Sequence, residues 1–457
     1  MMPRTLAAVA TELDARLVGD DTKFHQVGID SRKIHNGALF VAIEGERLDG
    51  NDYVAHAHAR GAAGALVSRQ IEVPLPQLKV PDTRVALGHM ARAWRANFPI
   101  PVVAVTGSNG KTTVKEMIAS ILKRSRRTCV TQGNLNNDIG VPLTIMELED
   151  EHEALVVELG ANHSGEIDYL SGLVQPTVGV ITNACAAHLE GFESVEGVAT
   201  AKGELLDHLP STGDAVLNND DGFCVDWRLR SRAKSVLTFG FGAGADCTIV
   251  GDVVAEVSGC QFTMQLPEGE QVKINLPLVG RHNVLNALAA AAAAHALGVH
   301  TEDIVNGLND ANAVKGRLNV LHGRGGAAII DDSYNANPAS VCAALDYLAS
   351  ANGMRILVLG DMAELGAAAI EMHCEIGRYA THRCDALLTI GSLSRHAADA
   401  FGACGQSFKS IAELSEALEV LLAEDVTILV KGSRVMGLDQ LVRLLKSDDI
   451  SAEAPSC

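Results

Sequence analysis

The stretch that decides the fold is Thr106-Gly107-Ser108-Asn109-Gly110-Lys111-Thr112-Thr113. It follows an apolar run at residues 102–106 and precedes an amphipathic pattern at residues 114–122, so we expect a strand, a glycine-rich loop and a helix in that order. The glycines let backbone N–H groups approach phosphate oxygens. Lys111 supplies a cation for the β- and γ-phosphates, and a threonine hydroxyl can ligate Mg²⁺. The segment is therefore typical of a nucleotide-binding loop.

This loop departs from the common G-x-x-x-x-G-K-[ST] spacing. That spacing would place a glycine at position 105, where the chain has Val105, and the first glycine of the loop is Gly107 instead. A glycine-rich turn that only caps a helix would account for the glycines. It would give no reason for Gly-Lys-Thr-Thr directly after a buried strand, so we interpret the segment as a variant phosphate-binding loop.

The composition is that of a multidomain globular protein. The chain has 457 residues, which exceeds the usual size of one hydrophobic core. Its formal net charge of -19 and its aromatic content of 4% disfavour contact with nucleic acids or anionic membranes. Ten scattered cysteines without a C-x-x-C pair favour free thiols in a reducing compartment. With no signal-peptide pattern or membrane span in sight, we expect a cytoplasmic protein.

The alternation of strand-like and helix-like patterns restarts at two points along the chain, which predicts an α/β protein of three domains. Residues 1–83 mix short strand and helix patterns and end in a proline-punctuated stretch, as in a small N-terminal α/β domain. Residues 84–314 alternate apolar runs with helical patterns and predict a central P-loop ATPase-like domain with a mainly parallel sheet. Residues 315–457 repeat that alternation and predict a C-terminal Rossmann-like domain.

The strands and helices expected in the two larger domains can be given by residue. We expect strands at 102–106, 154–157, 178–181, 327–330, 355–359, 386–390 and 427–430, and helices at 85–96, 114–122 and 284–299.

Three polar side chains follow the phosphate loop in places where ligands gather on a parallel sheet. Glu158 directly follows the apolar run at residues 154–157, and His188 follows the next run. Lys202 is the third. Taken singly, they have plainer explanations: a surface acid, a structural histidine and a solvated helix lysine. Their joint placement favours a site in which Lys111, Glu158, His188 and Lys202 are catalytic.

Further motifs resemble the Mur ligases of bacterial cell-wall synthesis, whose nucleotide loop is T-G-[ST]-N-G-K-T. The motifs are GNLNNDIGVP at residues 133–142, GRHN at 280–283, DDSYNANP at 331–338 and GDMAELG at 360–366. They are similar to those of the last-acting ligase, and the similarity spans nearly the whole chain. That ligase joins D-alanyl-D-alanine to UDP-N-acetylmuramoyl-tripeptide through an acyl-phosphate, giving the pentapeptide, ADP and phosphate. The resemblance thus implies these two substrates, with ATP and Mg²⁺ as cofactors.

The resemblance also implies roles for individual residues. ATP would contact Gly107, Ser108, Asn109, Gly110, Lys111, Thr112, Thr113, Asn283, Asn286, Arg317, Asp332 and Tyr334. The other substrates would contact Ser31, Arg32, Asn134, Asn137, Asn162, His163 and Lys431. One Mg²⁺ would be held by Thr112 and Glu158, and a second by His188 and Lys202. The lysine would be carbamylated, because an ammonium would repel Mg²⁺ whereas a carbamate offers an anionic oxygen.

Plainer explanations stay open for some of these residues. Ser31 and Arg32 would equally suit a polar turn between strands, Asn134 and Asn137 an asparagine-rich turn, and Asn286 a polar position on a helix.

Other functions also stay open. The chain can be another amide ligase of the superfamily, such as the third-residue ligase or a folylpolyglutamate synthase, or a non-catalytic nucleotide-binding protein. Residues 331–338 replace the D-Y-A-H-T-P of the third-residue ligase, and the N-K-x-D motif of a GTP-hydrolysing switch is absent. A dead scaffold would be expected to have lost its catalytic side chains. We therefore expect a monomeric ligase whose domains close during catalysis, without a nucleic-acid partner.

Overall fold

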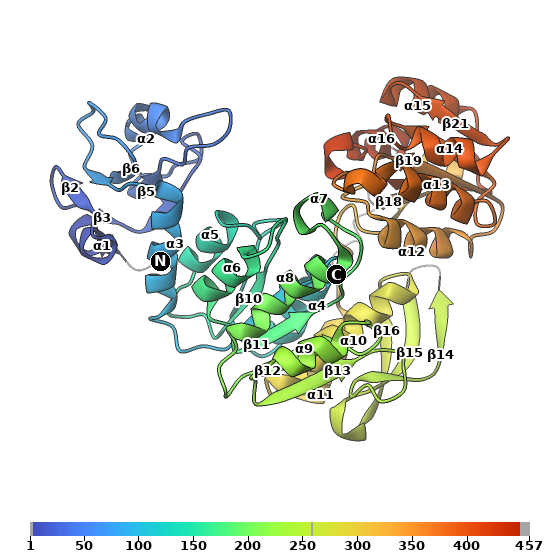
Figure 1. Ribbon diagram of the computed structural model, residues 1–457, viewed down its shortest axis with the longest axis horizontal. Coiled ribbons are helices and arrows are strands. Elements are labelled where there is room, and N and C mark those ends of the chain that lie inside the picture. Colours follow the sequence, from blue (N-terminus) through green and yellow to red (C-terminus); the bar gives the residue numbers. More distant parts are fainter. Residues whose placement is uncertain (1–2, 257–258, 448–457) are drawn as a thin grey trace, which may run out of the picture.

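The computed structural model describes residues 3–256 and 259–447, which fold into three lobes that follow one another along the sequence (Figure 1). The N-terminal lobe (blue) and the C-terminal lobe (orange to red) both adjoin the central lobe (cyan to yellow). Each lobe is built around its own sheet. We keep residues 1–83, 84–314 and 315–457 as proposed domain boundaries.

The N-terminal lobe holds a five-stranded sheet in the order β2-β7-β6-β5-β4, with β2 antiparallel to its neighbour and the others parallel. A two-stranded ladder, β1 with β3, lies beside it. Its strands are β1 Arg4–Thr5, β2 Arg16–Val18, β3 Lys23–Phe24, β4 Gln26–Gly28, β5 Ala38–Val41, β6 Gly64–Val67 and β7 Gln77–Lys79. Its helices are α1 Leu6–Leu13, η1 Gly50–Tyr53 and α2 Val54–Ala59, and α3 Thr83–Arg95 leads into the central lobe.

The central lobe is organised by a fully parallel six-stranded sheet in the order β13-β12-β11-β8-β10-β9. Its strands are β8 Val102–Thr106, β9 Thr128–Val130, β10 Ala154–Glu158, β11 Val178–Ile181, β12 Asp214–Asn218 and β13 Ser235–Phe239. Its helices are α4 Lys111–Leu122, α5 Gly140–Met146, α6 Glu166–Val174, α7 Leu189–Phe192, α8 Val195–Asp207, α9 Cys224–Arg230, α10 Arg281–Ala296 and α11 Thr301–Asn309.

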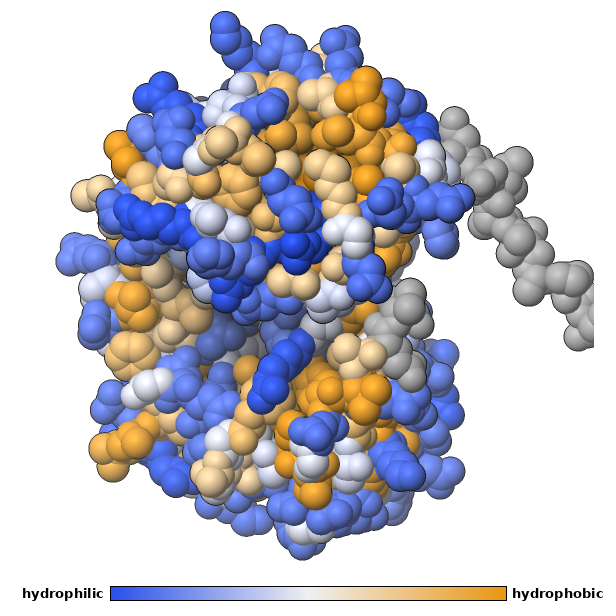
Figure 2. All heavy atoms as spheres, turned by 90° about the vertical axis from the view of Figure 1, so that its right-hand side faces the viewer, coloured by the Kyte–Doolittle hydropathy of each residue, from blue (hydrophilic) through white to orange (hydrophobic). Residues whose placement is uncertain are grey.

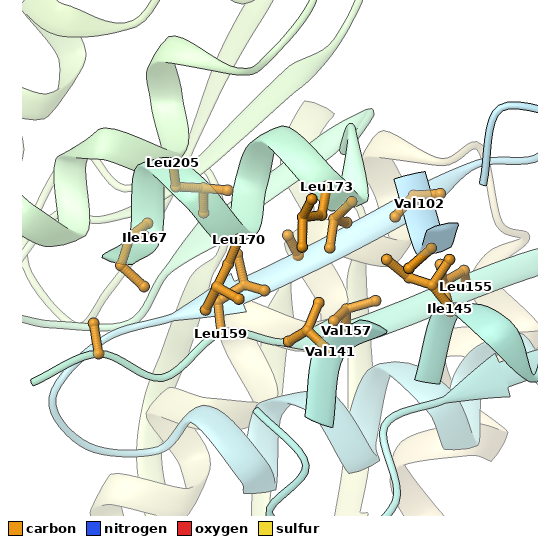
Figure 3. Packing of buried hydrophobic residues seen from close by; sticks show 14 of the residues in the cluster. Val102, Val141, Ile145, Leu155, Val157, Leu159, Ile167, Leu170, Leu173 and Leu205 are labelled. Atoms are coloured by element: carbon orange, nitrogen blue, oxygen red, sulfur yellow. The ribbon is translucent and has the colours of Figure 1, made fainter. Parts of the chain in front are cut away.

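Helices cover both faces of this sheet, and consecutive side chains of β10 show why. Leu155 and Val157 pack with the α5 and α6 side chains, as Figure 3 shows for Ile145 and Leu170. Val156 points to the opposite face, into the core formed with α4 and α10. A strand buried on both faces has a continuous apolar run, which is why the sequence predicts this strand at residues 154–157.

The sequence interpretation missed the three-stranded antiparallel sheet β14-β15-β16, and it also gave no strand at β9, β12 or β13. The antiparallel sheet consists of β14 Thr248–Glu256, β15 Gly259–Gln265 and β16 Gln271–Leu276, with the turn η2 Pro267–Gly269 before the last strand. One face of it, including Phe262 and Ile274, joins the core around α10. The central lobe is thus mainly parallel, as expected, with an antiparallel addition.

The C-terminal lobe has a six-stranded sheet in the order β17-β18-β22-β19-β20-β21, parallel except for the edge strand β17. Its strands are β17 Asn319–His322, β18 Ala328–Asp332, β19 Met354–Gly360, β20 Ala386–Ile390, β21 Gly405–Phe408 and β22 Val426–Lys431. Its helices are η3 Arg324–Gly326, α12 Pro338–Leu348, η4 Gly366–Ala368, α13 Ala369–Ala380, α14 Arg395–Phe401, α15 Ile411–Glu419, η5 Arg434–Met436 and α16 Asp439–Leu445. The mixed α/β architecture and the Rossmann-like alternation expected from the sequence are confirmed.

Helix boundaries were less well predicted than strands. The helix expected at residues 114–122 begins at Lys111, and the one expected at 284–299 runs from Arg281 to Ala296. No helix in the described portion of the chain is long and apolar enough to cross a bilayer.

Candidate active site

The predicted phosphate loop joins β8 to α4 in a conformation that requires its glycines. Gly107 has φ +145° and Gly110 has φ +82°, and a Cβ on Gly107 would lie 1.9 Å from Thr182 Oγ1. Lys111 Nζ donates to the carbonyls of Gly107, at 2.7 Å, and Ser108, at 3.2 Å. Burial lowers the pKa of Lys111 to about 8, against the opposing effect of Glu158. The side chain of Lys111 therefore folds back onto its own loop, with Nζ bonded to the loop carbonyls.

Glu158 ends β10 beside this loop and is almost fully buried. Its Oε1 accepts a hydrogen bond of 2.7 Å from Asn136 Nδ2, and its backbone N–H donates to Thr131 Oγ1 at 3.1 Å. Its Oε2 has no hydrogen-bond partner among the described residues. A buried carboxylate oxygen without a partner is costly, and an oxygen of this kind is what Mg²⁺ prefers as a ligand. This position fits a metal ion.

Lys202, on α8, is also almost fully buried. Its Nζ lies 3.5 Å from the carbonyl of Ala161 and 5.1 Å from the centre of the Phe192 ring. Burial lowers the pKa of Lys202 to about 7, and the charge of Lys111 lowers it further. Near neutral pH about half of the Lys202 side chains are therefore uncharged amines, the form that reacts with CO₂.

The described residues hold no cluster of three or more His, Cys, Asp or Glu side chains that could bind an ion unaided. Thr112, Glu158, His188 and Lys202, the expected metal ligands, contribute only one such side chain to each proposed ion. These side chains alone are therefore too few to complete the oxygen coordination that Mg²⁺ requires.

The C-terminal lobe brings several expected residues to the phosphate loop. Arg317 Nη2 donates to Thr112 Oγ1 at 2.9 Å, and its guanidinium lies 4.4 Å from the centre of the Tyr334 ring. Lys431 Nζ forms an ion pair of 2.6 Å with Asp332 Oδ2. Lys431 is about a hundred residues away in sequence from Arg317, Asp332 and Tyr334, so only the fold brings these residues together.

The two lobes enclose a cleft of about 1040 Å³. Figure 2 shows hydrophilic side chains along the waist between the C-terminal lobe, above, and the central lobe, below. The expected residues that line the cleft are Ser108, Asn109, Gly110, Lys111, Thr113, Asn137, Glu158, Asn162, His188, Asn283, Asn286, Arg317, Asp332, Tyr334 and Lys431. Those that do not line it are Ser31, Arg32, Gly107, Thr112, Asn134, His163 and Lys202.

Five of the seven residues outside the cleft fall into two groups; of the other two, His163 contacts Glu166, which lines the cleft, and the Asn134 carbonyl accepts from the backbone N–H of Asn136. Gly107, Thr112 and Lys202 lie within or beneath its wall, as their contacts show. Ser31 and Arg32 lie in the N-terminal lobe, where Ser31 Oγ is 3.0 Å from His56 Nδ1 and Arg32 pairs with Asp30 at 2.9 Å. The Arg32 side chain is exposed.

Sequence reasoning missed several polar residues that hold the cleft together. Asn183 Oδ1 accepts from the backbone N–H of Asn109 at 2.9 Å, and Asn337 Nδ2 donates to Asn109 Oδ1 at 2.8 Å across the two lobes. The expected site residues include Asn134 and Asn137 but not Asn136, which is the asparagine that contacts Glu158. Asn136 and Asn337 both lie in motifs quoted from the sequence, so the motifs were the available signal.

Comparison with known proteins shows the family. The Mur ligase middle domain matches residues 105–294, the Mur ligase glutamate ligase domain residues 316–434, and the Mur ligase family catalytic domain residues 23–95. With the phosphate loop, the cleft and these matches together, the chain belongs to the Mur ligase family.

Individual relatives are similar along nearly the whole chain. UDP-N-acetylmuramoyl-tripeptide--D-alanyl-D-alanine ligase of Escherichia coli (strain K12) is 43% identical over 451 residues, which cover 98% of this chain and 99% of that protein. The crystal structure of MurF from Acinetobacter baumannii has a TM-score of 0.91 at 37% identity, covering 97% of this chain and 98% of that one. MurF from Thermotoga maritima, solved in complex with ADP, has a TM-score of 0.81 at 26% identity, covering 92% and 96%.

Proposed function

We propose that this protein is an ATP-dependent ligase that joins D-alanyl-D-alanine to UDP-N-acetylmuramoyl-tripeptide in peptidoglycan synthesis. The observation that carries this proposal is the full-length similarity to a ligase of that name, at 43% identity. The cleft supports it, because it combines a phosphate loop with polar groups from two lobes.

ATP would lie with its phosphates against the loop at residues 107–113. Backbone N–H groups at the start of α4 and the Lys111 ammonium would contact the phosphate oxygens, as helix N-termini and lysines do in nucleotide sites. Asn283 and Asn286 would face the base, and Arg317, Asp332 and Tyr334 would approach from the C-terminal lobe. The similar Thermotoga maritima structure, solved with ADP, supports this assignment.

Mg²⁺ would be held by Thr112 and Glu158 at one position and by His188 and carbamylated Lys202 at the other. The free Oε2 of Glu158 supports the first position. The low pKa of Lys202 supports the second, because its neutral amine adds CO₂ and releases a proton to give the carbamate. When bound, the metal would neutralise phosphate charge, in addition to what Lys111 contributes.

The reaction requires activation of a carboxylate, since oxide is a very poor leaving group. The terminal carboxylate of the tripeptide would form an O–P bond to the γ-phosphorus of ATP as the bond to ADP breaks. The dipeptide amine would then form the C–N bond, lose a proton and expel phosphate. Lys111 and Arg317 would stabilise the negative charge that gathers on the phosphoryl oxygens.

The remaining substrates would use the rim of the cleft and the N-terminal lobe. Ser31 and Arg32 would hold the uridine diphosphate end, while Asn134, Asn137, Asn162 and His163 would lie near the sugar and peptide. Lys431 would lie on the dipeptide side. Closure of the lobes over the cleft would exclude water from the acyl-phosphate.

We also propose that the enzyme is a cytoplasmic monomer. Every cysteine in the described part of the chain is a free thiol, which suits a reducing compartment. Gel filtration with light scattering would test the monomer.

To test the proposal, the enzyme is incubated with ATP, Mg²⁺ and UDP-N-acetylmuramoyl-tripeptide, with and without D-alanyl-D-alanine. The product is identified by mass spectrometry. The expected product is the pentapeptide, formed only when both substrates are present. Addition of a single amino acid, or of glutamate to a folate, would assign the chain to another ligase of the superfamily. ATP binding without any amide product would indicate a non-catalytic protein.

A further inference from the structure

His188 and Glu364 join the central and C-terminal lobes at the edge of the cleft. His188 precedes α7, and its Nδ1 is hydrogen-bonded to Glu364 Oε2. The backbone adds a second contact, because Glu190 N–H donates to the carbonyl of Glu364 at 3.4 Å. Both side chains line the cleft that holds the phosphate loop. Glu364 lies in the motif at residues 360–366, for which the resemblance implies no individual residue role.

The backbone at both residues is in an unusual conformation. His188 has φ +54° and Glu364 has φ +62°, a region that non-glycine residues rarely occupy. Such conformations persist only where the surrounding structure enforces them, and they cluster at functional sites. Here two of them meet across one inter-lobe contact.

The loop that carries Glu364 is firmly held. Asp361 Oδ1 accepts backbone hydrogen bonds from Leu393 at 3.0 Å and Ser394 at 2.7 Å. Met362 N–H donates to Nε2 of the buried His373 at 3.0 Å. These contacts fix the three residues before Glu364, together with a bond of 2.7 Å from Ala363 N–H to Ser433 Oγ. The carboxylate is thus presented to His188 from a rigid support.

The other carboxylates that line the cleft from either lobe have different partners. Asp332 pairs with Lys431, and Asp138 with Arg84. Glu166 accepts from the backbone N–H of Asn162 and contacts His163. Glu158 is bonded to Asn136. Among the described residues, Glu364 is therefore the carboxylate that engages the His188 ring.

We propose that Glu364 is a positioning residue that fixes the His188 ring through Nδ1, so that Nε2 is left free to bind the metal. Histidine ligands commonly bond a carboxylate through the nitrogen that does not face the metal, which sets the tautomer and the orientation of the ring. The inference rests on the proposed function, because that function supplies the metal. Since Glu364 belongs to the other lobe, this metal position is complete only when the lobes meet.

The test compares Mn²⁺ binding by the full-length protein with ADP present, measured by electron paramagnetic resonance, in wild type and E364Q. We expect E364Q to weaken Mn²⁺ binding roughly 10- to 100-fold. Pulsed measurements should show an imidazole nitrogen bound to Mn²⁺ in wild type, a weaker signal in E364Q and none in H188N. Because Glu364 acts through His188, adding E364Q to H188N should cause no further loss of affinity.

Glu190 provides the matched control, since it lies at the same contact but does not line the cleft. E190Q should bind Mn²⁺ as wild type does, and melting curves should show that all variants are folded. Unchanged Mn²⁺ affinity in E364Q, or an equal loss from E364Q in the H188N background, would overturn the inference. A rise confined to the KM for the dipeptide would overturn it too and make Glu364 a substrate contact. Pentapeptide formation by the same wild-type preparation shows separately whether the proposed function holds.

Discussion

Replacing Asn136 by alanine should expose how much the cleft depends on the orientation of Glu158. The Asn136 amide makes the hydrogen bond of 2.7 Å to Oε1, and Oε2 has no partner among the described residues, so N136A leaves a buried carboxylate with neither oxygen bonded by a side chain. A hydrogen bond to a charged group is worth about 1.5–3 kcal/mol. That corresponds to a loss of roughly 10- to 150-fold in any equilibrium that needs the oriented carboxylate.

The assay is phosphate release as a function of Mg²⁺ concentration at saturating ATP, tripeptide and dipeptide. We expect N136A to raise the Mg²⁺ concentration needed for half-maximal rate by about 10-fold or more. Gln132, exposed in the same loop, supplies the control: Q132A should behave as wild type. The reasoning is refuted if N136A requires no more Mg²⁺ than wild type, or if Q132A shifts the requirement as much.

Three further predictions concern the loop, the lysine and the inter-lobe arginine. G107A should abolish binding of an ATP analogue in calorimetry, because the new Cβ would lie 1.9 Å from Thr182 Oγ1 at φ +145°; retained affinity would contradict this. At fixed CO₂ pressure the carbamate on Lys202, seen by ¹³C NMR with labelled bicarbonate, should increase with pH, because its pKa of about 7 makes the amine increasingly neutral above that value. A pH-independent signal, or one that persists in K202R, would refute it. R317M removes the bond to Thr112 and should raise the KM for ATP roughly 10-fold, by about 1.4 kcal/mol of lost binding; an unchanged KM would show that Arg317 does not contact the nucleotide.

The seven strands named from the sequence in the two larger domains were predictable because they are buried on both faces. The runs at residues 102–106 and 178–181 match β8 and β11, since a parallel strand covered by helices needs apolar residues throughout. Helix α4 began earlier than expected because Gly110, with φ +82°, precedes it instead of a Ser, Thr or Asp cap. Helix α10 is rich in alanine and buried on nearly all sides. Its sequence therefore lacks the apolar periodicity that would show where the helix begins and ends.

The candidate site was predictable as motifs but not as contacts. Residues 133–142 contain three asparagines, and only the fold shows that Asn136 is the one that bonds Glu158. The contact between His188 and Glu364 joins residues far apart in sequence, which no local pattern records. The missed sheet β14-β15-β16 packs one face on the core and alternates buried with exposed residues, a weaker signal than a continuous apolar run.

The most direct test of the proposed chemistry follows the oxygen of the acceptor carboxylate. UDP-N-acetylmuramoyl-tripeptide labelled with ¹⁸O in its terminal carboxylate would be converted with ATP and D-alanyl-D-alanine. The ¹⁸O content of the phosphate and of the peptide product would then be measured by mass spectrometry. Ligation through an acyl-phosphate predicts that the label moves from the carboxylate to phosphate as the pentapeptide forms. Unlabelled phosphate, or ATP hydrolysis without pentapeptide, would contradict it.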